Sequence, residues 1–198
     1  MNALRLITEL DVAAGLLNLE RQELLELLAE PNSASSLARI TKRPRQQINY
    51  HLRELEKRGL IKHVEDRKRG NCVERVLVRA DESLCISPSV LGALAPVPER
   101  EPDKLSANYL IATAAKLIRE LGHIAMHAGK KRKKVATFTL SAEVRFASPE
   151  KRAEFAREAS DALARISAKY NDDQSPEGRT FNWIFGAYPA ITKDLEGE

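Results

Sequence analysis

The sequence predicts an α+β protein with an N-terminal helix-turn-helix unit and hairpin, joined to a C-terminal helix-strand-helix-strand domain. Three observations predict this fold. Residues 33–58 show helical spacing of apolar side chains, interrupted once by a turn. Residues 60–78 alternate as a β-hairpin does, and residues 104–188 change twice from a helical to an extended period.

The composition is that of an ordinary soluble globular protein. The chain has 198 residues, of which 43% are hydrophobic and 30% charged, enough to bury a real core. No run of 18 or more apolar residues is present, so no membrane span is predicted. The first residues contain acids and lack the apolar core of a secretory signal, which predicts a cytoplasmic protein. Two cysteines, Cys72 and Cys85, are too few for a thiolate metal site, and a cytosolic disulfide is not expected.

Positive charge is concentrated in one part of the chain. Residues 31–79 contain 13 basic and 5 acidic side chains, a net charge of +8. Residues 1–30 have a net charge of −4, and residues 80–198 have a net charge of zero. A basic segment of this kind is the electrostatic pattern expected of a surface that binds nucleic acid.

Two helices are expected before the turn unit, over residues 2–18 and 20–30. Pro31 ends the second of them. Their apolar side chains recur at helical spacing and should face the core. These side chains are Leu4, Ile7, Leu10, Ala14 and Leu17 in the first helix, and Leu24, Leu25, Leu27 and Leu28 in the second.

The turn unit consists of two further helices. The first spans residues 33–40, and Asn32 or Ser33 can cap its start. Residues 41–43 make the turn. Pro44 suits the first position of the second helix, which runs to residue 58 and stops at Gly59. Its buried face is formed by Ile48, Leu52 and Leu55.

The opposite face of the second helix is polar and basic. At about 100° per residue, this face carries Gln46, Tyr50, Arg53 and Lys57, with Gln47 and Asn49 at its flanks. Amide side chains can read adenine edges, and arginine can read guanine or hold a phosphate. We therefore predict that residues 44–58 form a recognition helix in the major groove of double-stranded DNA. Arg43, Arg45 and His51 complete the predicted contacts of this segment.

A β-hairpin with a basic tip follows. Residues 60–64 and 72–78 are the expected strands, and Gly70-Asn71 can supply the positive φ of a tight reversal. Residues 62–78 would then form a wing that contacts the DNA backbone or minor groove. Its predicted DNA contacts are Arg67, Lys68, Arg69 and Asn71. The two helices and the hairpin together have the plan of a winged helix-turn-helix.

This segment resembles the winged helices of bacterial and archaeal ArsR-type transcriptional regulators. The shared pattern is Leu37-Ala38, then His51-Leu52, Leu55 and Gly59-Leu60-Ile61, and the resemblance covers residues 19–80. It implies a DNA-binding regulator, a first helix that helps two copies dimerise, and a place for His51 near the DNA backbone. The residues alone leave two alternatives open: a first helix that only covers the core, and a half-buried packing role for His51.

A proline-rich linker is expected over residues 81–104, between a DNA-binding domain (residues 1–80) and a C-terminal domain (residues 105–198). Prolines favour an extended, semi-stiff connector, although residues 89–95 could form one helical turn. The C-terminal domain begins with a helix over residues 104–128. The five basic residues 130–134 that follow are either a solvated loop or a supplementary phosphate contact.

The rest of the C-terminal domain is expected to alternate strand, helix and strand, over residues 135–146, 148–170 and 179–188. The helix should bury Phe155, Ala159, Leu163 and Ile166. Two strands make a poor sheet alone, so their apolar faces need the flanking helices or a second copy of the chain. We therefore expect this half to form a homodimer.

The sequence contains few signs of metal binding, catalysis or effector binding. His123 and His127 share a helix face and could contact a metal, but partly exposed interface histidines explain them as well. The Cys-x-Cys motif of ArsR-type metal sensors is absent. No cofactor is predicted, and the lack of a phosphate-binding glycine loop, a nucleophile elbow or paired carboxylates predicts that the chain is not an enzyme. The aromatic residues of the C-terminal half either line a pocket for an apolar effector or form a plain core.

These observations leave two functions. The first is a sequence-specific DNA-binding transcriptional regulator, a repressor in its simplest form, that acts as a homodimer. The alternative is a winged-helix protein-interaction module whose C-terminal domain binds a small molecule. The operator sequence and the target genes cannot be inferred from the residues.

Overall fold

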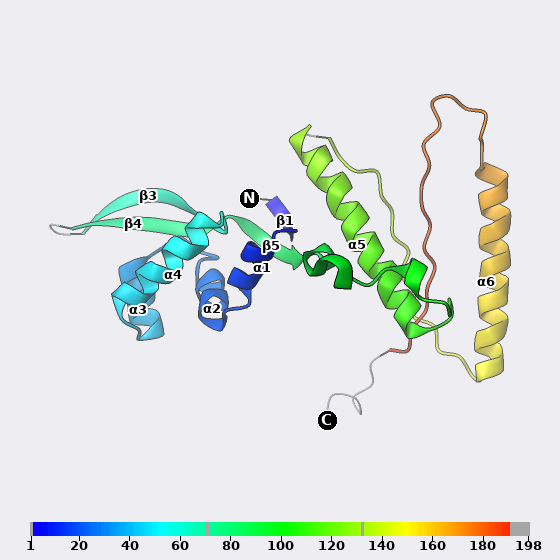
Figure 1. Ribbon diagram of the computed structural model, residues 1–198, viewed down its shortest axis with the longest axis horizontal. Helices are drawn as coiled ribbons and strands as arrows, with labels where there is room; N and C mark the ends of the chain where they lie inside the picture. Colours follow the sequence, from blue (N-terminus) through cyan, green and yellow to red (C-terminus); the bar gives the residue numbers. More distant parts are fainter. Residues whose placement is uncertain (1, 70–71, 132, 191–198) are drawn as a thin grey trace. The chain divides into compact units, whose positions relative to one another are not determined.

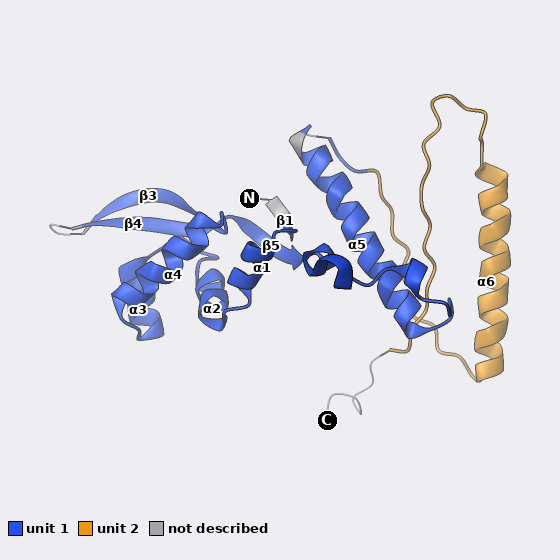
Figure 2. Cartoon of the chain, in the orientation of Figure 1, with its two compact units in different colours: residues 1–135 blue, residues 136–198 orange. Residues whose placement is uncertain are grey.

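The computed structural model of the protein describes residues 2–69, 72–131 and 133–190. Contacts divide the chain into two compact units, Met1–Val135 and Ala136–Glu198, which Figure 2 shows in blue and orange. The first unit contains all strands of the described residues, and the second contains one helix, α6. The α+β class predicted from the sequence is confirmed.

The winged helix-turn-helix lies in the first unit. Helices α1 (Leu10–Leu16), α2 (Leu19–Leu27), α3 (Ala34–Thr41) and α4 (Arg45–Lys57) precede the hairpin of β3 (Ile61–Arg69) and β4 (Cys72–Arg79). A short strand, β2 (Asn32–Ser33), pairs with the other edge of β4, which gives an antiparallel sheet in the order β2-β4-β3 (Figure 1).

One apolar core holds these helices against the sheet. Leu24, Leu37, Ile48 and Leu55 are at most 1% exposed, and all four belong to the same cluster of buried residues. Burying one such side chain contributes about 1.5–3 kcal/mol. Helical spacing therefore predicts correctly which faces of residues 20–30 and 44–58 pack into the apolar core.

The prediction of a helix over residues 2–18 is wrong for its first third. Residues Asn2–Ile7 form strand β1, which pairs in parallel with β5 (Asp81–Ile86), and only α1 is helical. Ile7 is fully buried. Leucine and isoleucine at positions 4, 6 and 7 suit a strand as well as a helix, and pairing with a distant segment decides between them.

The segment predicted as a linker has local structure. After β5, it forms two short 3-10 helices, η1 (Pro88–Leu94) and η2 (Pro98–Arg100). Each starts with a proline, and the Ser87 side chain accepts a hydrogen bond from the Ser89 backbone N–H at the start of η1. The fixed φ of proline makes it a good first residue of a helical turn. Pro88 and Pro98, which the sequence analysis assigns to an extended linker, therefore begin the two 3-10 helices.

Helix α5 (Ala107–Lys130) packs within the first unit, although the sequence places it with the C-terminal half. Ala112 and Ala115 are buried at 0% and 5% exposure. Further along, Gly122 faces strand β1, and a Cβ atom added there would overlap the side chain of Leu6. The small residues of α5 therefore allow it to approach its neighbours closely.

We expect alanine to have opposite effects at the two glycines of α5. Gly129→Ala should raise the free energy of unfolding by up to about 1 kcal/mol, because alanine favours a helix and open space surrounds Gly129. Gly122→Ala should lower it, because Leu6 must leave its place on the helix. Urea unfolding of both variants checks this; equal gains at the two positions would contradict the close packing of α5 on β1.

The second unit contains α6 (Pro149–Tyr170), which the Ser148 side chain caps by accepting a hydrogen bond from the Lys151 backbone N–H at 3.3 Å. The extent of this helix agrees with the prediction. Its predicted burial is wrong, since Phe155 and Ile166 are 37% and 51% exposed.

The two strands predicted for the C-terminal half are not formed. Residues 136–147 and 179–190 have no assigned helix or strand, and both segments run as drawn-out coil in Figure 1. A strand requires a hydrogen-bonded neighbour, and the described part of the chain offers these segments none. The alternating pattern therefore distinguished these segments from the helices correctly, but the two strands predicted from it are absent from the described residues.

Candidate nucleic-acid interface

The recognition helix is positioned by the turn that precedes it. The Ser33 hydroxyl accepts a hydrogen bond from the Ser36 backbone N–H at 3.2 Å and thereby caps α3. Lys42 ends α3 in the left-handed conformation, with φ at 55°. Pro44 then precedes the first helical residue, Arg45. Gly59, with φ at 64°, follows α4 and turns the chain into the hairpin, as its predicted role requires.

The outward face of α4 carries the predicted polar and basic residues. Ile48, Leu52 and Leu55 point into the core at 1%, 3% and 0% exposure. Arg45, Gln46, Tyr50, Arg53 and Lys57 are exposed, and Asn49 is half-buried at the flank. Tyr50 is 58% exposed, and its ring lies edge-on to the His51 ring with 5.3 Å between the centroids.

Three other predicted contact residues turn toward α2 and meet at Glu20. The Gln47 amide donates to both carboxylate oxygens of Glu20, at 3.0 and 3.1 Å. His51 is 6% exposed, and its Nε2 lies 2.6 Å from Glu20 Oε2. Arg43 pairs with Glu23 at 2.6 Å and lies 3.9 Å from Glu20. For His51, this geometry corresponds to the packing role that the sequence left open.

The Glu20 contacts fix the orientation of α4. They tie the turn and the first half of the helix to α2 through charged hydrogen bonds, which are stronger than neutral ones. The outward face of α4 is therefore presented on a rigid support. Glu20 was missed as a site residue because nothing in its own neighbourhood in the sequence connects it to residues 43–51.

The acidic residues of α4 are neutralised within the protein. Glu54 accepts a hydrogen bond from Arg58 at 2.6 Å, and this bond lowers the pKa of the Glu54 carboxyl. Glu56 pairs with Arg75 of β4 at 2.7 Å, and the bond raises the pKa of the Arg75 guanidinium. The outward-facing cations of α4 form no salt bridge with any described residue; they are Arg45, Arg53 and Lys57. The net field at this face is therefore positive.

A hollow of about 240 Å³ lies between α4 and β4, beside the start of α3. Arg45, Asn49 and Arg53 form one wall of it, and Glu74 and Arg75 of β4 are on the other side. The residues from β4 were not among the predicted contacts, because the sequence does not reveal which hairpin residues face the helix. The hollow joins the recognition helix and the wing into one surface.

The wing has nearly the predicted limits, but its first strand is longer than predicted. Strand β3 continues through Glu65–Arg69, which the sequence predicts to lie in the tip between the two strands. In this extension Asp66 pairs with Arg75 and Arg67 with Glu74 across the ladder. Opposite charges on paired strand positions are favourable, and they let this polar segment remain in the sheet.

The tip of the wing is basic up to the last described residue. Lys68 is exposed, and Arg67 is exposed and bonded to Glu65 at 2.8 Å. Arg69 ends β3, while Gly70 and Asn71 lie outside the described residues. The predicted tip contacts of Arg67 and Lys68 are thus accessible to a partner.

One histidine of the pair on α5 is bonded to the backbone of its own helix. His127 Nδ1 lies 2.8 Å from the backbone carbonyl oxygen of His123, one turn earlier. Over residues 2–69, 72–131 and 133–190, no group of three or more histidine, cysteine or acidic side chains could hold a metal ion.

The aromatic residues of the C-terminal half are largely exposed in the described part of the second unit. Phe138, Trp183 and Tyr188 are between 56% and 79% exposed. A larger hollow, of about 410 Å³, lies in the first unit beside β5 and is lined partly by Leu16, Leu25 and Leu84. These exposures do not fit the plain buried core that the sequence left as the alternative to an effector pocket.

Comparison with known proteins identifies the class of this domain. Residues 13–64 match a family described as a helix-turn-helix domain. No curated protein matches the chain. The fold and this match together define a helix-turn-helix domain of the DNA-binding kind, in a protein whose described helices are all too short or too polar to cross a membrane.

Proposed function

We propose that this protein is an ArsR-type transcriptional regulator of the cytoplasm that binds double-stranded DNA in a sequence-specific manner and represses transcription as a homodimer. Residues 1–80 form the DNA-binding domain, and residues 105–198 contribute to dimerisation and to the response to an effector. The observation that carries the proposal is the outward face of α4. Its cations are exposed and unpaired among the described residues, while its carboxylates are paired internally.

The side chains of this face match the chemistry of a major groove. Gln46 and Asn49 have amides that can donate to and accept from adenine, and Arg53 can form two hydrogen bonds to guanine. Tyr50 presents an exposed ring that can contact a thymine methyl group. Arg45 and Lys57 lie toward the two ends of the helix, where phosphates border the groove.

The wing supports the same docking. With α4 in the major groove, the extended β3-β4 hairpin reaches the adjacent backbone or minor groove through Arg67 and Lys68. In a homodimer, two recognition helices would contact half-sites about one helical turn of DNA apart. His51, Gln47 and Arg43 act as positioning residues in this arrangement, because their contacts are to Glu20 and Glu23.

Replacing one arginine of α4 tests the proposal. Arg53→Ala should weaken binding by about 1–3 kcal/mol per half-site, roughly 5- to 150-fold, because it removes a bidentate base contact. Fluorescence anisotropy with a labelled duplex from upstream of the protein's own gene measures this. Lys104→Ala is the control, since it removes the same charge from an exposed position outside the winged helix. If both variants bind like the unmodified protein, α4 does not face DNA.

A further inference from the structure

The second unit is incomplete as a single chain. Its two extended segments, residues 136–147 and 179–190, make no backbone–backbone hydrogen bond with any described residue. Extended backbone whose N–H and C=O groups lack protein partners is a template for another strand. Helix α6, although 22 residues long, has no buried residue.

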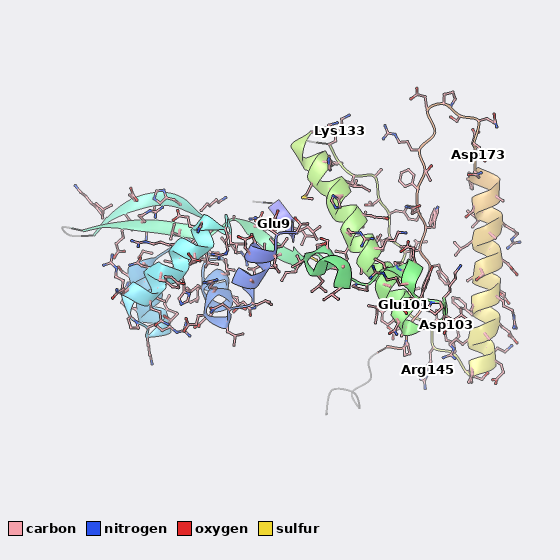
Figure 3. The ribbon with its side chains drawn as sticks, viewed as in Figure 1. Glu9, Glu101, Asp103, Lys133, Arg145 and Asp173 are labelled. Atoms are coloured by element: carbon pink, nitrogen blue, oxygen red, sulfur yellow. The ribbon has the colours of Figure 1, made fainter. Side chains whose placement is uncertain are left out.

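The arrangement of the unit is nevertheless specific. The rings of Phe138 and Trp183, one from each extended segment, are 4.8 Å apart in an edge-on contact. Phe155 of α6 contacts Phe146 at 5.2 Å and Phe185 at 6.4 Å. Both segments run opposite to α6 in Figure 2, as in a strand-helix-strand crossover. The residues that flank α6, Arg145 before it and Asp173 after it, lie at its two ends (Figure 3).

A large apolar surface remains open on this unit. Eleven large apolar side chains of its described residues are at least 37% exposed. They are Phe138, Leu140, Val144, Phe155, Ile166, Tyr170, Phe181, Trp183, Ile184, Phe185 and Tyr188. At about 150–250 Å² per aromatic side chain, the exposed parts of the seven aromatic residues amount to roughly 600–1,000 Å². A stable protein interface buries about 800 Å² on each partner, so this summed aromatic area is of the size that one dimer interface buries.

The low charge of the two extended segments favours an apolar partner over a polyanion or a strongly charged protein. The two extended segments carry three charged residues, Glu143, Arg145 and Arg179. A suitable partner therefore offers an apolar face of the same size, together with a free extended edge. A second copy of this unit has both properties. When two identical faces are related by a two-fold axis, each covers the apolar side chains of the other and pairs with its backbone.

We propose that a second copy of the chain completes the second unit, by pairing its extended backbone with residues 136–147 or 179–190 and covering their apolar side chains. This deepens the homodimer of the proposed function by naming its interface, which is separate from the DNA-binding face. In the dimer, the two segments become strands of a sheet shared by both copies. This explains why their sequences alternate like strands although no strand is assigned in the single chain.

Sedimentation of the full-length protein tests the oligomer. The unmodified chain should sediment as a dimer, and Leu140→Glu should shift it to a monomer. Leu94→Glu is the matched control, because Leu94 and Leu140 are both 86% exposed and Leu94 lies in η1 of the first unit. Circular dichroism of each variant checks that the helices remain. A monomeric unmodified protein would overturn the proposal, and so would loss of the dimer in both variants.

Two further measurements test the backbone pairing itself. Amides of residues 136–147 and 179–190 should exchange slowly with deuterium in the dimer and rapidly in the folded Leu140→Glu monomer. The fluorescence of Trp183, the single tryptophan of the chain, should shift to the red in that monomer. A dimer whose amides in both segments exchange freely would refute strand pairing between copies.

The DNA test and the dimer test fail independently. The Leu140→Glu monomer retains α4 and the wing, so it should still bind duplex DNA, with lower affinity than the dimer. If the unmodified protein binds no DNA, its sedimentation and exchange still decide the dimer proposal. If the protein is monomeric, the effect of Arg53→Ala on DNA affinity still decides the DNA-binding proposal.

Discussion

Raising the salt concentration from about 50 to about 200 mM should weaken the binding of duplex DNA by roughly 10³-fold or more. The physical reason is the release of counterions from each phosphate that a lysine or arginine neutralises. Each copy of the chain presents exposed cations that form no salt bridge among the described residues. On the winged helix, these include Lys42, Arg45, Arg53, Lys57, Lys62 and Lys68. If about half of them contact phosphates, a dimer makes about six contacts.

Fluorescence anisotropy over a salt series measures this effect as the slope of the logarithm of affinity against the logarithm of salt concentration. Lys57→Ala should reduce the slope by about one per copy, whereas Lys104→Ala should leave it unchanged. An affinity that does not depend on salt would show that these cations do not contact phosphates, and the proposed DNA-binding surface would have to be abandoned.

Replacing Leu55 by alanine should lower the free energy of unfolding by about 2–5 kcal/mol. Leu55 is fully buried where α4 packs on the core, so the change removes apolar contacts and leaves a cavity. Typical domains are stable by only about 5–15 kcal/mol, so a loss of this size is a large part of the total. Urea unfolding followed by circular dichroism measures it.

Leu105→Ala is the matched control for this substitution, because Leu105 is 97% exposed. Its effect on stability should stay within about 0.5 kcal/mol. The Leu55 variant should also lose DNA affinity at temperatures where it begins to unfold, since α4 is then no longer held. A Leu55→Ala protein as stable as the Leu105→Ala protein would contradict the assignment of the inward face of α4.

The recognition helix was predictable from sequence because local patterns determine it. The spacing of Ile48, Leu52 and Leu55, the proline before the helix and the glycine after it specify its limits and its inward face. The outward face follows from the same spacing. What each outward side chain contacts is not local, and for that reason Gln47 and His51 were assigned to DNA although they bind Glu20.

Long-range pairing set the limit of prediction elsewhere. Strand β1 exists because β5, about eighty residues away, supplies its partner edge. The extension of β3 through Glu65–Arg69 depends on its pairing with β4, whose register cannot be inferred from the sequence. In the second unit the extended segments were recognised, but a periodic pattern cannot show whether the neighbouring strand belongs to the same chain.

Strand β1 has a consequence for communication within the first unit. The Arg5 guanidinium donates a hydrogen bond to the Gly59 carbonyl at 2.7 Å and lies 3.8 Å from the Asp81 carboxylate. The next residue, Leu6, is the one that Gly122 of α5 accommodates. Two adjacent side chains of β1 therefore connect α5 with Gly59, the residue that turns the chain from α4 into the hairpin. The proposed recognition helix and α5 thus share one strand as a support, although about sixty residues separate them in the sequence.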